Sequence, residues 1–163
     1  MHRLLRSTSA YYCFTFVASC IAVYFAMGAF GHDLRSPLRF AGDTLHCLVP
    51  LKSIVNGEPW WRIERLNAPF HYNHYTYWAG STLDFLWAGF VALIVRHVGV
   101  ALVLAFITKA AFAGVTAAWC LRRLGAVAPV AMAFGILYSC IPYALGNNTS
   151  MYNLSTHFVP ILC

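Results

Sequence analysis

Two long stretches with almost no charge constrain the fold most, because each is long enough to cross a lipid bilayer. Residues Ala10–Phe30 contain no charged side chain, and residues Val98–Leu121 contain only Lys109. A helix rises about 1.5 Å per residue, so about 20 apolar residues cross a hydrocarbon core roughly 30 Å thick. The sequence therefore predicts helices that span a membrane.

The composition excludes the common classes of soluble protein. Hydrophobic residues make up 60% of the 163 residues and charged residues only 10%, whereas soluble domains have about 45–50% and about 25%. The net charge of +6 does not indicate nucleic-acid binding, because the basic residues do not form one polar face. They occur in pairs at the edges of apolar segments, as in membrane proteins: Arg3 and Arg6, Arg35 and Arg39, Arg62 and Arg65, Arg122 and Arg123.

The first predicted span is 10–30, and the polar region 31–81 follows it as a loop on the far side of the membrane. The basic residues Arg3 and Arg6 place the N-terminus in the cytoplasm. A cleaved signal peptide is the alternative, but its apolar region usually has only about 7–15 residues. We therefore expect an uncleaved signal-anchor helix.

The order of the later spans depends on the segment 83–95, which is short for a crossing and fits a helix in the membrane interface. If it lies in the interface, a second span at 98–121 brings Arg122 and Arg123 to the cytoplasm. If it crosses, these two arginines are external. The first reading gives a third span at 129–145 and the start of a fourth at 158–163. We expect an all-α, polytopic transmembrane bundle, with residues 1–163 forming a single incomplete membrane domain.

Asp43 is the leading candidate for a catalytic side chain in the external loop. A helix is predicted to begin at Thr44, so Asp43 has either the ordinary role of a helix cap or the role of a general base at the membrane surface. For the other acidic residues simpler roles are expected. Asp33 is solvated or weakly paired with Arg35, and Asp84 stabilises the start of the interfacial helix.

Lys109 is the one charged residue within a predicted span. Placing a lysine at mid-bilayer costs roughly 2.5–3.5 kcal/mol on insertion scales, so it should face the bundle interior or a wet cavity. There it would either pair with an acidic residue or bind an anion. His46, His71 and His74 lack a carboxylate at ligand spacing, so no metal and no cofactor are predicted.

Several short motifs together resemble the N-terminal part of bacterial membrane proteins of the GT-C glycosyltransferase superfamily. They are Gly42-Asp43 in an external loop, Leu66–Asn73, a short interfacial helix, Leu121–Gly125 at the end of a span and Tyr138–Tyr143 at the end of the next. The resemblance implies an inner-membrane, multi-pass enzyme that uses a polyprenyl-phosphate-linked sugar. It also implies that later spans are missing, so that this chain alone is inactive.

On this resemblance, Asp43 takes the role of the loop carboxylate that deprotonates or orients the acceptor. Tyr72 and Asn73 belong to the aromatic run that would line the lipid or acceptor side. For the leaving phosphate, the candidates in this sequence are Arg35, Arg39 and Lys52. Membrane lipid is the expected partner. The alternatives are part of a transporter or lipid-translocating protein with Lys109 in its path, and a truncated membrane protein without activity.

Overall fold

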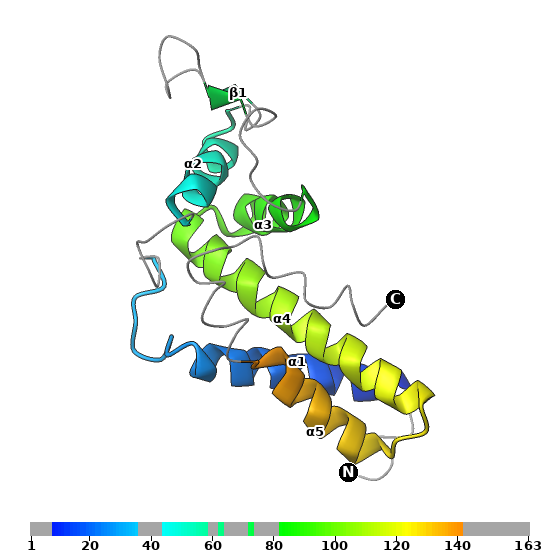
Figure 1. Ribbon diagram of the computed structural model, residues 1–163. Coiled ribbons are helices and arrows are strands. Elements are labelled where there is room, and N and C mark those ends of the chain that lie inside the picture. The colour runs from blue at the N-terminus through cyan, green and yellow to red at the C-terminus, as the bar shows by residue number, and fades with distance from the viewer. Residues whose placement is uncertain (1–7, 36–43, 59–61, 64–71, 74–81, 142–163) are drawn as a thin grey trace. The chain divides into compact units, whose positions relative to one another are not determined.

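The computed structural model describes residues 8–35, 44–58, 62–63, 72–73 and 82–141 (Figure 1). Helices dominate this part of the chain, which agrees with the predicted all-α class. A two-residue antiparallel pair is the exception, in which Arg62 lies opposite Asn73 and Ile63 opposite Tyr72. The elements are α1 (Thr8–Ala26), α2 (Thr44–Val55), β1 (Arg62–Ile63), β2 (Tyr72–Asn73), α3 (Thr82–Val95), α4 (Val98–Arg123) and α5 (Ala128–Ser139).

The chain divides into two compact units, and the long helix α4 runs through both. Unit 1 contains α1, α5 and the part of α4 from Ile107 onward. Unit 2 contains α2, the β1–β2 pair, α3 and the part of α4 up to Phe106.

Unit 1 is held together by small residues that let helix backbones approach closely. A Cβ atom added at Gly114 of α4 would lie 2.7 Å from the carbonyl oxygen of Gly135 in α5 and 2.8 Å from Oγ of Ser19 in α1. The Tyr11 hydroxyl donates a hydrogen bond of 2.9 Å to the carbonyl oxygen of Ala128, which ties α1 to the start of α5. Close packing through glycine, alanine and serine is typical of helices that associate within a membrane.

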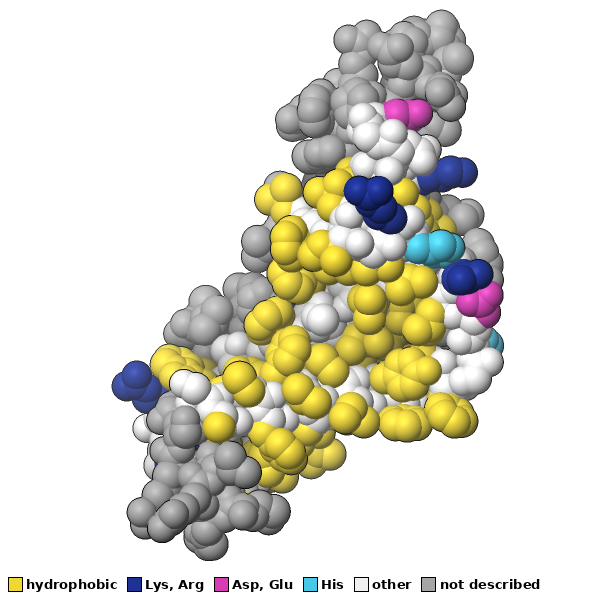
Figure 2. All heavy atoms as spheres, turned by 180° about the vertical axis from the view of Figure 1, so that it is seen from behind, with side chains coloured by type: hydrophobic (Ala, Val, Ile, Leu, Met, Phe, Trp, Pro, Cys, Tyr) yellow, Lys and Arg dark blue, Asp and Glu magenta, His cyan; other side chains and the backbone are white. Residues whose placement is uncertain are grey.

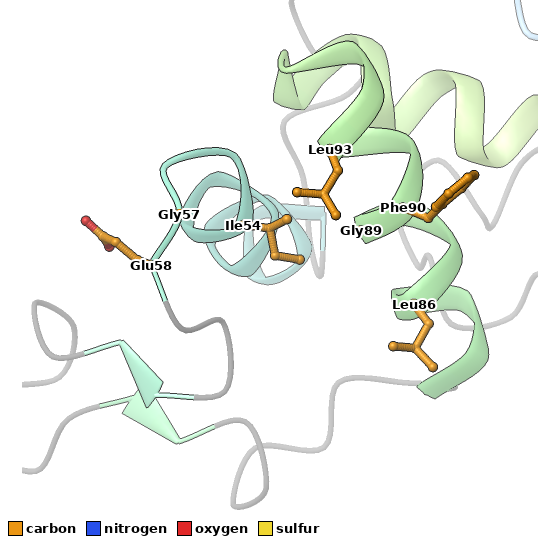
Figure 3. A pocket seen from close by; sticks show the side chains of 7 residues that line it. All are labelled: Ile54, Gly57, Glu58, Leu86, Gly89, Phe90 and Leu93. Carbon is orange, nitrogen blue, oxygen red and sulfur yellow. The ribbon is translucent and has the colours of Figure 1, made fainter.

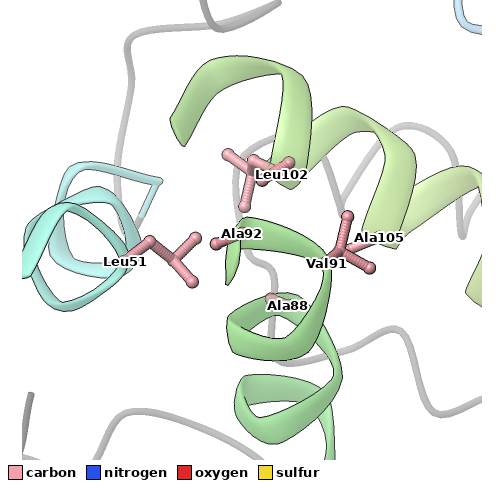
Figure 4. Close-up of a cluster of buried hydrophobic side chains, with 7 residues drawn as sticks. Leu51, Ala88, Val91, Ala92, Leu102 and Ala105 are labelled. Carbon is pink, nitrogen blue, oxygen red and sulfur yellow. The ribbon is translucent and has the colours of Figure 1, made fainter. Parts of the chain in front are cut away.

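Unit 2 has a small hydrophobic core between three helices (Figure 4). Leu51 of α2 is buried there to 1% exposure, beside alanines of α3 and the first turns of α4. The buried members are Leu51, Ala88, Val91, Ala92, Ala101, Leu102 and Ala105. Gly89 of α3 lies close to α2, because a Cβ atom there would come within 3.0 Å of Cδ1 of Ile54.

Glycine ends both α2 and α4 in the same way. At α2, the N–H of Gly57 donates to Ile54 and the N–H of Glu58 donates to Ser53. Gly57 has φ +74° and Gly125, after α4, has φ +93°. This left-handed backbone is accessible to glycine at low cost, and the paired hydrogen bonds satisfy carbonyl groups at the helix end.

The ends of α1 and α5 correct two predicted boundaries. Helix α1 stops at Ala26 rather than Phe30, because Gly28 (φ +67°) turns the chain away. Helix α5 stops at Ser139, whereas the predicted third span ran to residue 145. Residues 142–145 and the predicted fourth span lie outside the described residues. Pro142 follows Ile141, and a proline disfavours helical backbone at the residue before it. The 12 residues of α5 rise only about 18 Å, too little to cross a bilayer.

Candidate functional site

Unit 1 buries several polar side chains along with small apolar ones, and it exposes many large apolar side chains, which is unusual for a soluble protein. Thr15, Ser19 and Ser139 are fully buried, and Lys109 is only 4% exposed. Large hydrophobic side chains instead point outward on all three helices: Phe14, Val17, Ile21, Phe25, Phe112, Trp119, Val130, Phe134 and Leu137. Figure 2 shows hydrophobic side chains over much of the face in view. In water this arrangement is costly, whereas in a bilayer lipid chains cover the outer face.

Two described helices are long and apolar enough to cross a membrane. They are Ser9–Ala26 and Val98–Arg123. Only 22% of the α1 segment is buried, so it does not resemble the core helix of a soluble protein, which is mostly buried. Together with the burial pattern, these helices support a membrane location.

The buried hydroxyl groups in unit 1 are satisfied mostly within their own helices. Thr15 donates to the carbonyl oxygen of Tyr11 over 2.9 Å, and Ser139 donates to that of Ile136 over 2.7 Å. Such bonds satisfy a hydroxyl group without a partner helix. The Ser19 hydroxyl has no hydrogen-bond partner among the described residues, and it packs against Gly114. These groups therefore serve close packing rather than a binding cavity.

The predicted helix after Asp43 is present, because α2 begins at Thr44. Asp43 itself and Arg39 lie outside the described residues, as do His71 and His74 of the predicted loop. Tyr72 and Asn73 form the strand β2. The catalytic and substrate-binding roles of these residues remain predictions.

Arg35 lies against the first turn of α4. The backbone of Leu34 and Arg35 packs so closely on Gly99 that a side chain at that position would collide with it. Oδ1 of Asp33 accepts a 3.0 Å hydrogen bond from the backbone N–H of Arg35, a local turn contact typical of aspartate. The Arg35 side chain is exposed, and so are Arg96 and His97 just before α4. Three basic or titratable side chains thus belong to the segments that meet at the start of α4.

The other predicted cations differ in their surroundings. Lys52 is exposed in the last turn of α2, where the helix dipole favours a positive charge. Lys109 belongs to unit 1, whereas Arg35, Lys52, Tyr72 and Asn73 belong to unit 2. The burial of Lys109 agrees with the expectation that a lysine within a span avoids lipid.

A pocket in unit 2 was not predicted from the sequence. It has a volume of about 390 Å³ and is lined by Ile54, Gly57, Glu58, Leu86, Gly89, Phe90 and Leu93. Ile54 projects from α2 toward α3, whereas the Glu58 side chain points away from α3 (Figure 3). None of the predicted site residues lines it. The sequence signal that could have found it is the helical spacing of Leu86, Phe90 and Leu93.

Among the residues that the structure describes, no cluster of His, Cys, Asp and Glu side chains could hold a metal ion. Comparisons with known protein families, with curated proteins and with solved structures find no match to this chain.

Proposed function

We propose that this chain belongs to a multi-pass inner-membrane glycosyltransferase of the GT-C type, with its N-terminus in the cytoplasm. The observation that carries the proposal is the start of α2 at Thr44, directly after Asp43, in the segment between α1 and α4. In the sequence, Asp43 thus directly precedes a short helix that lies, in the chain, between two candidate spans. The motif resemblance from Gly42 to Tyr143 supports the same reaction class.

In the proposed reaction, an acceptor hydroxyl group attacks the anomeric carbon of a polyprenyl-phosphate sugar. The new bond joins the acceptor oxygen to that carbon, and the bond from the carbon to the phosphate oxygen breaks. The acceptor proton passes to the carboxylate of Asp43, and the lipid phosphate leaves with the bonding electron pair. Arg35 and Lys52 have exposed side chains that can stabilise the negative charge of the phosphate. Arg39 is a further candidate for this role.

The replacement Asp43→Asn tests this assignment when it is introduced into the gene in its own cell. General-base catalysis contributes about 10²–10⁴-fold to a rate, so transfer from a radiolabelled polyprenyl-phosphate sugar in isolated membranes should fall by that factor. The matched control is Asp33→Asn, because an amide oxygen can still accept the hydrogen bond from the N–H of Arg35. Undiminished transfer by the Asp43→Asn membranes, at equal protein level, would remove Asp43 from the mechanism.

Lys109 supports a second candidate function, in which the chain belongs to a transporter or a lipid-translocating protein. A lysine that is 4% exposed within a candidate span is the type of residue that marks a substrate path. Under this alternative, Lys109→Gln abolishes translocation of the substrate across sealed vesicles, and Asp43→Asn has no effect. Under the glycosyltransferase proposal, Asp43→Asn is the damaging change.

A further inference from the structure

Two residues separate the end of α3 from the start of the candidate span α4. Arg96, the residue after α3, has φ +54°, a left-handed conformation that is uncommon for a residue with a side chain. Only Arg96 and His97 separate α3 from α4. Since α4 is a candidate span that begins at Val98, the end of α3 lies at the membrane boundary when α4 crosses.

The length of α3 keeps it in this boundary zone. Its 14 residues rise about 21 Å, which is short of a hydrocarbon core roughly 30 Å thick. One side of α3 packs into the core of unit 2 through Ala88, Val91 and Ala92. The other side exposes Leu86, Phe90, Leu93 and Ile94, each by more than half. An apolar face of this kind at the interface is covered by the acyl chains of lipids.

The pocket of unit 2 is part of this face. Leu86, Phe90 and Leu93 form its α3 wall, Ile54 forms its α2 wall, and its volume is about 390 Å³. Binding pockets typically have about 300–1,000 Å³ and mostly apolar walls. The Glu58 carboxylate at the edge of the pocket points away from α3 (Figure 3). The side chain that faces α3 across the pocket is therefore the apolar Ile54.

We propose that this pocket holds one acyl chain of a bilayer phospholipid. Leu86, Phe90 and Leu93 belong both to the pocket wall and to the exposed apolar face of α3, so a lipid that covers this face reaches the pocket directly. The proposal goes beyond glycosyl transfer and does not depend on it, because lipid retention is measured without a transfer assay.

A photo-crosslinking experiment with matched positions tests the proposal. Phe90 and Phe134 are exposed to similar extents, 54% and 58%, but only Phe90 lines the pocket. The photoreactive residue p-benzoylphenylalanine replaces one or the other in the full chain. The protein is extracted from membranes, exchanged into lipid-free detergent and then irradiated, and mass spectrometry identifies the adducts. We expect a phospholipid adduct at position 90 after exchange and its loss at position 134.

Three outcomes would overturn the proposal. Loss of the adduct at both positions means that lipid only surrounds the protein, and equal retention at both means that the pocket has no special role. A cross-link from position 90 to this chain or to another protein means that protein covers the pocket. A second measurement uses Leu93→Asp in the position 90 variant, which should abolish the adduct, whereas the matched Leu137→Asp should leave it unchanged.

Discussion

Gly114 of α4 and Gly135 of α5 pack against each other in unit 1. A Cβ atom at Gly135 would lie 2.5 Å from the Gly114 carbonyl oxygen and 2.9 Å from Cβ of Ala118. These obstacles are backbone atoms and a short side chain, which cannot rotate away. The two positions therefore need glycine for lack of space, although both have ordinary helical backbone.

We predict that Gly114→Ala destabilises unit 1. The added methyl group would overlap the Gly135 carbonyl oxygen and Ser19 Oγ, and overpacking of this type costs about 1–3 kcal/mol. Thermal unfolding in detergent should show a lower Tm. The matched control is Ala133→Val on the exposed side of α5, where surface changes stay within about 0.5 kcal/mol. An unchanged Tm for Gly114→Ala would mean that the helices can separate without cost.

The break between α3 and α4 keeps these two helices from joining into one. Without it, two apolar helices of 14 and 26 residues would join into one helix far longer than a bilayer requires. Arg96 and His97 prevent this, because the left-handed backbone of Arg96 ends α3 and the carbonyl oxygen of His97 accepts the hydrogen bond from Ala101. The other end of α4 carries Arg122 and Arg123, and Arg123 lies 5.1 Å from the ring centre of Trp119.

For the elements we predict that the two ends of α4 face opposite compartments. A cysteine in place of Arg96 should react with a membrane-impermeant maleimide added to cells or spheroplasts. A cysteine in place of Arg122 should react only in inverted vesicles, because paired arginines favour the cytoplasm. Both are placed in a chain whose six native cysteines are replaced by serine. Cytoplasmic labelling at position 96 would contradict the proposed orientation.

The sequence predicted the helix positions well where an apolar run ended at a charged or polar residue. Arg96 and His97 marked the break between 83–95 and 98–121, and α3 and α4 differ from those bounds by at most two residues. Thr44 marked the start of α2. The prediction was wrong where an apolar run continued past the helix end, as after Ala26 and Ser139. There the helix end is set by Gly28 or by the later Pro142, and the hydrophobicity of the run does not indicate where the helix ends.

The candidate site was less predictable than the helices. The pocket requires Ile54 and Phe90 to approach from two helices, and the spacing within one helix cannot reveal a partner on another. The same is true of Arg35, whose backbone reaches the first turn of α4 only through the path of the loop. Asp43 and Arg39 lie outside the described residues, so their roles rest on the sequence.

For the whole molecule, the packing of α1 against the other helices of unit 1 has a consequence for stability. Helix α1 packs on α5, and its Phe16 ring lies 4.9 Å from that of Phe112 in α4, measured between ring centres. Loss of α1 would expose Gly114 and the hydroxyl-bearing faces of unit 1. In this structure the first helix is thus part of the folded unit 1.

We predict that the expressed chain sediments with membranes, resists extraction by alkaline carbonate and retains α1. Intact-mass measurement of the purified protein should give the mass of a chain that includes residues 8–26. A chain with Ser19 changed to alanine serves as the control, because this replacement keeps the helix apolar and small at that position. Protein that stays in the supernatant without detergent, or a mature chain that begins after Gly28, would contradict the prediction.

Lys109 also affects how the protein is made. A lone helix with a lysine near its middle enters the bilayer at a cost of roughly 2.5–3.5 kcal/mol on insertion scales, and the folded protein lowers this penalty by keeping the side chain 4% exposed. Ribosomes synthesise α1 before α4, so Ser19, which packs against Gly114 of α4, is already present when Gly114 emerges. The order of the helices along the chain thus allows α1 and α4 to pack during translation, and moving α1 behind α5 would delay this packing until synthesis is nearly finished.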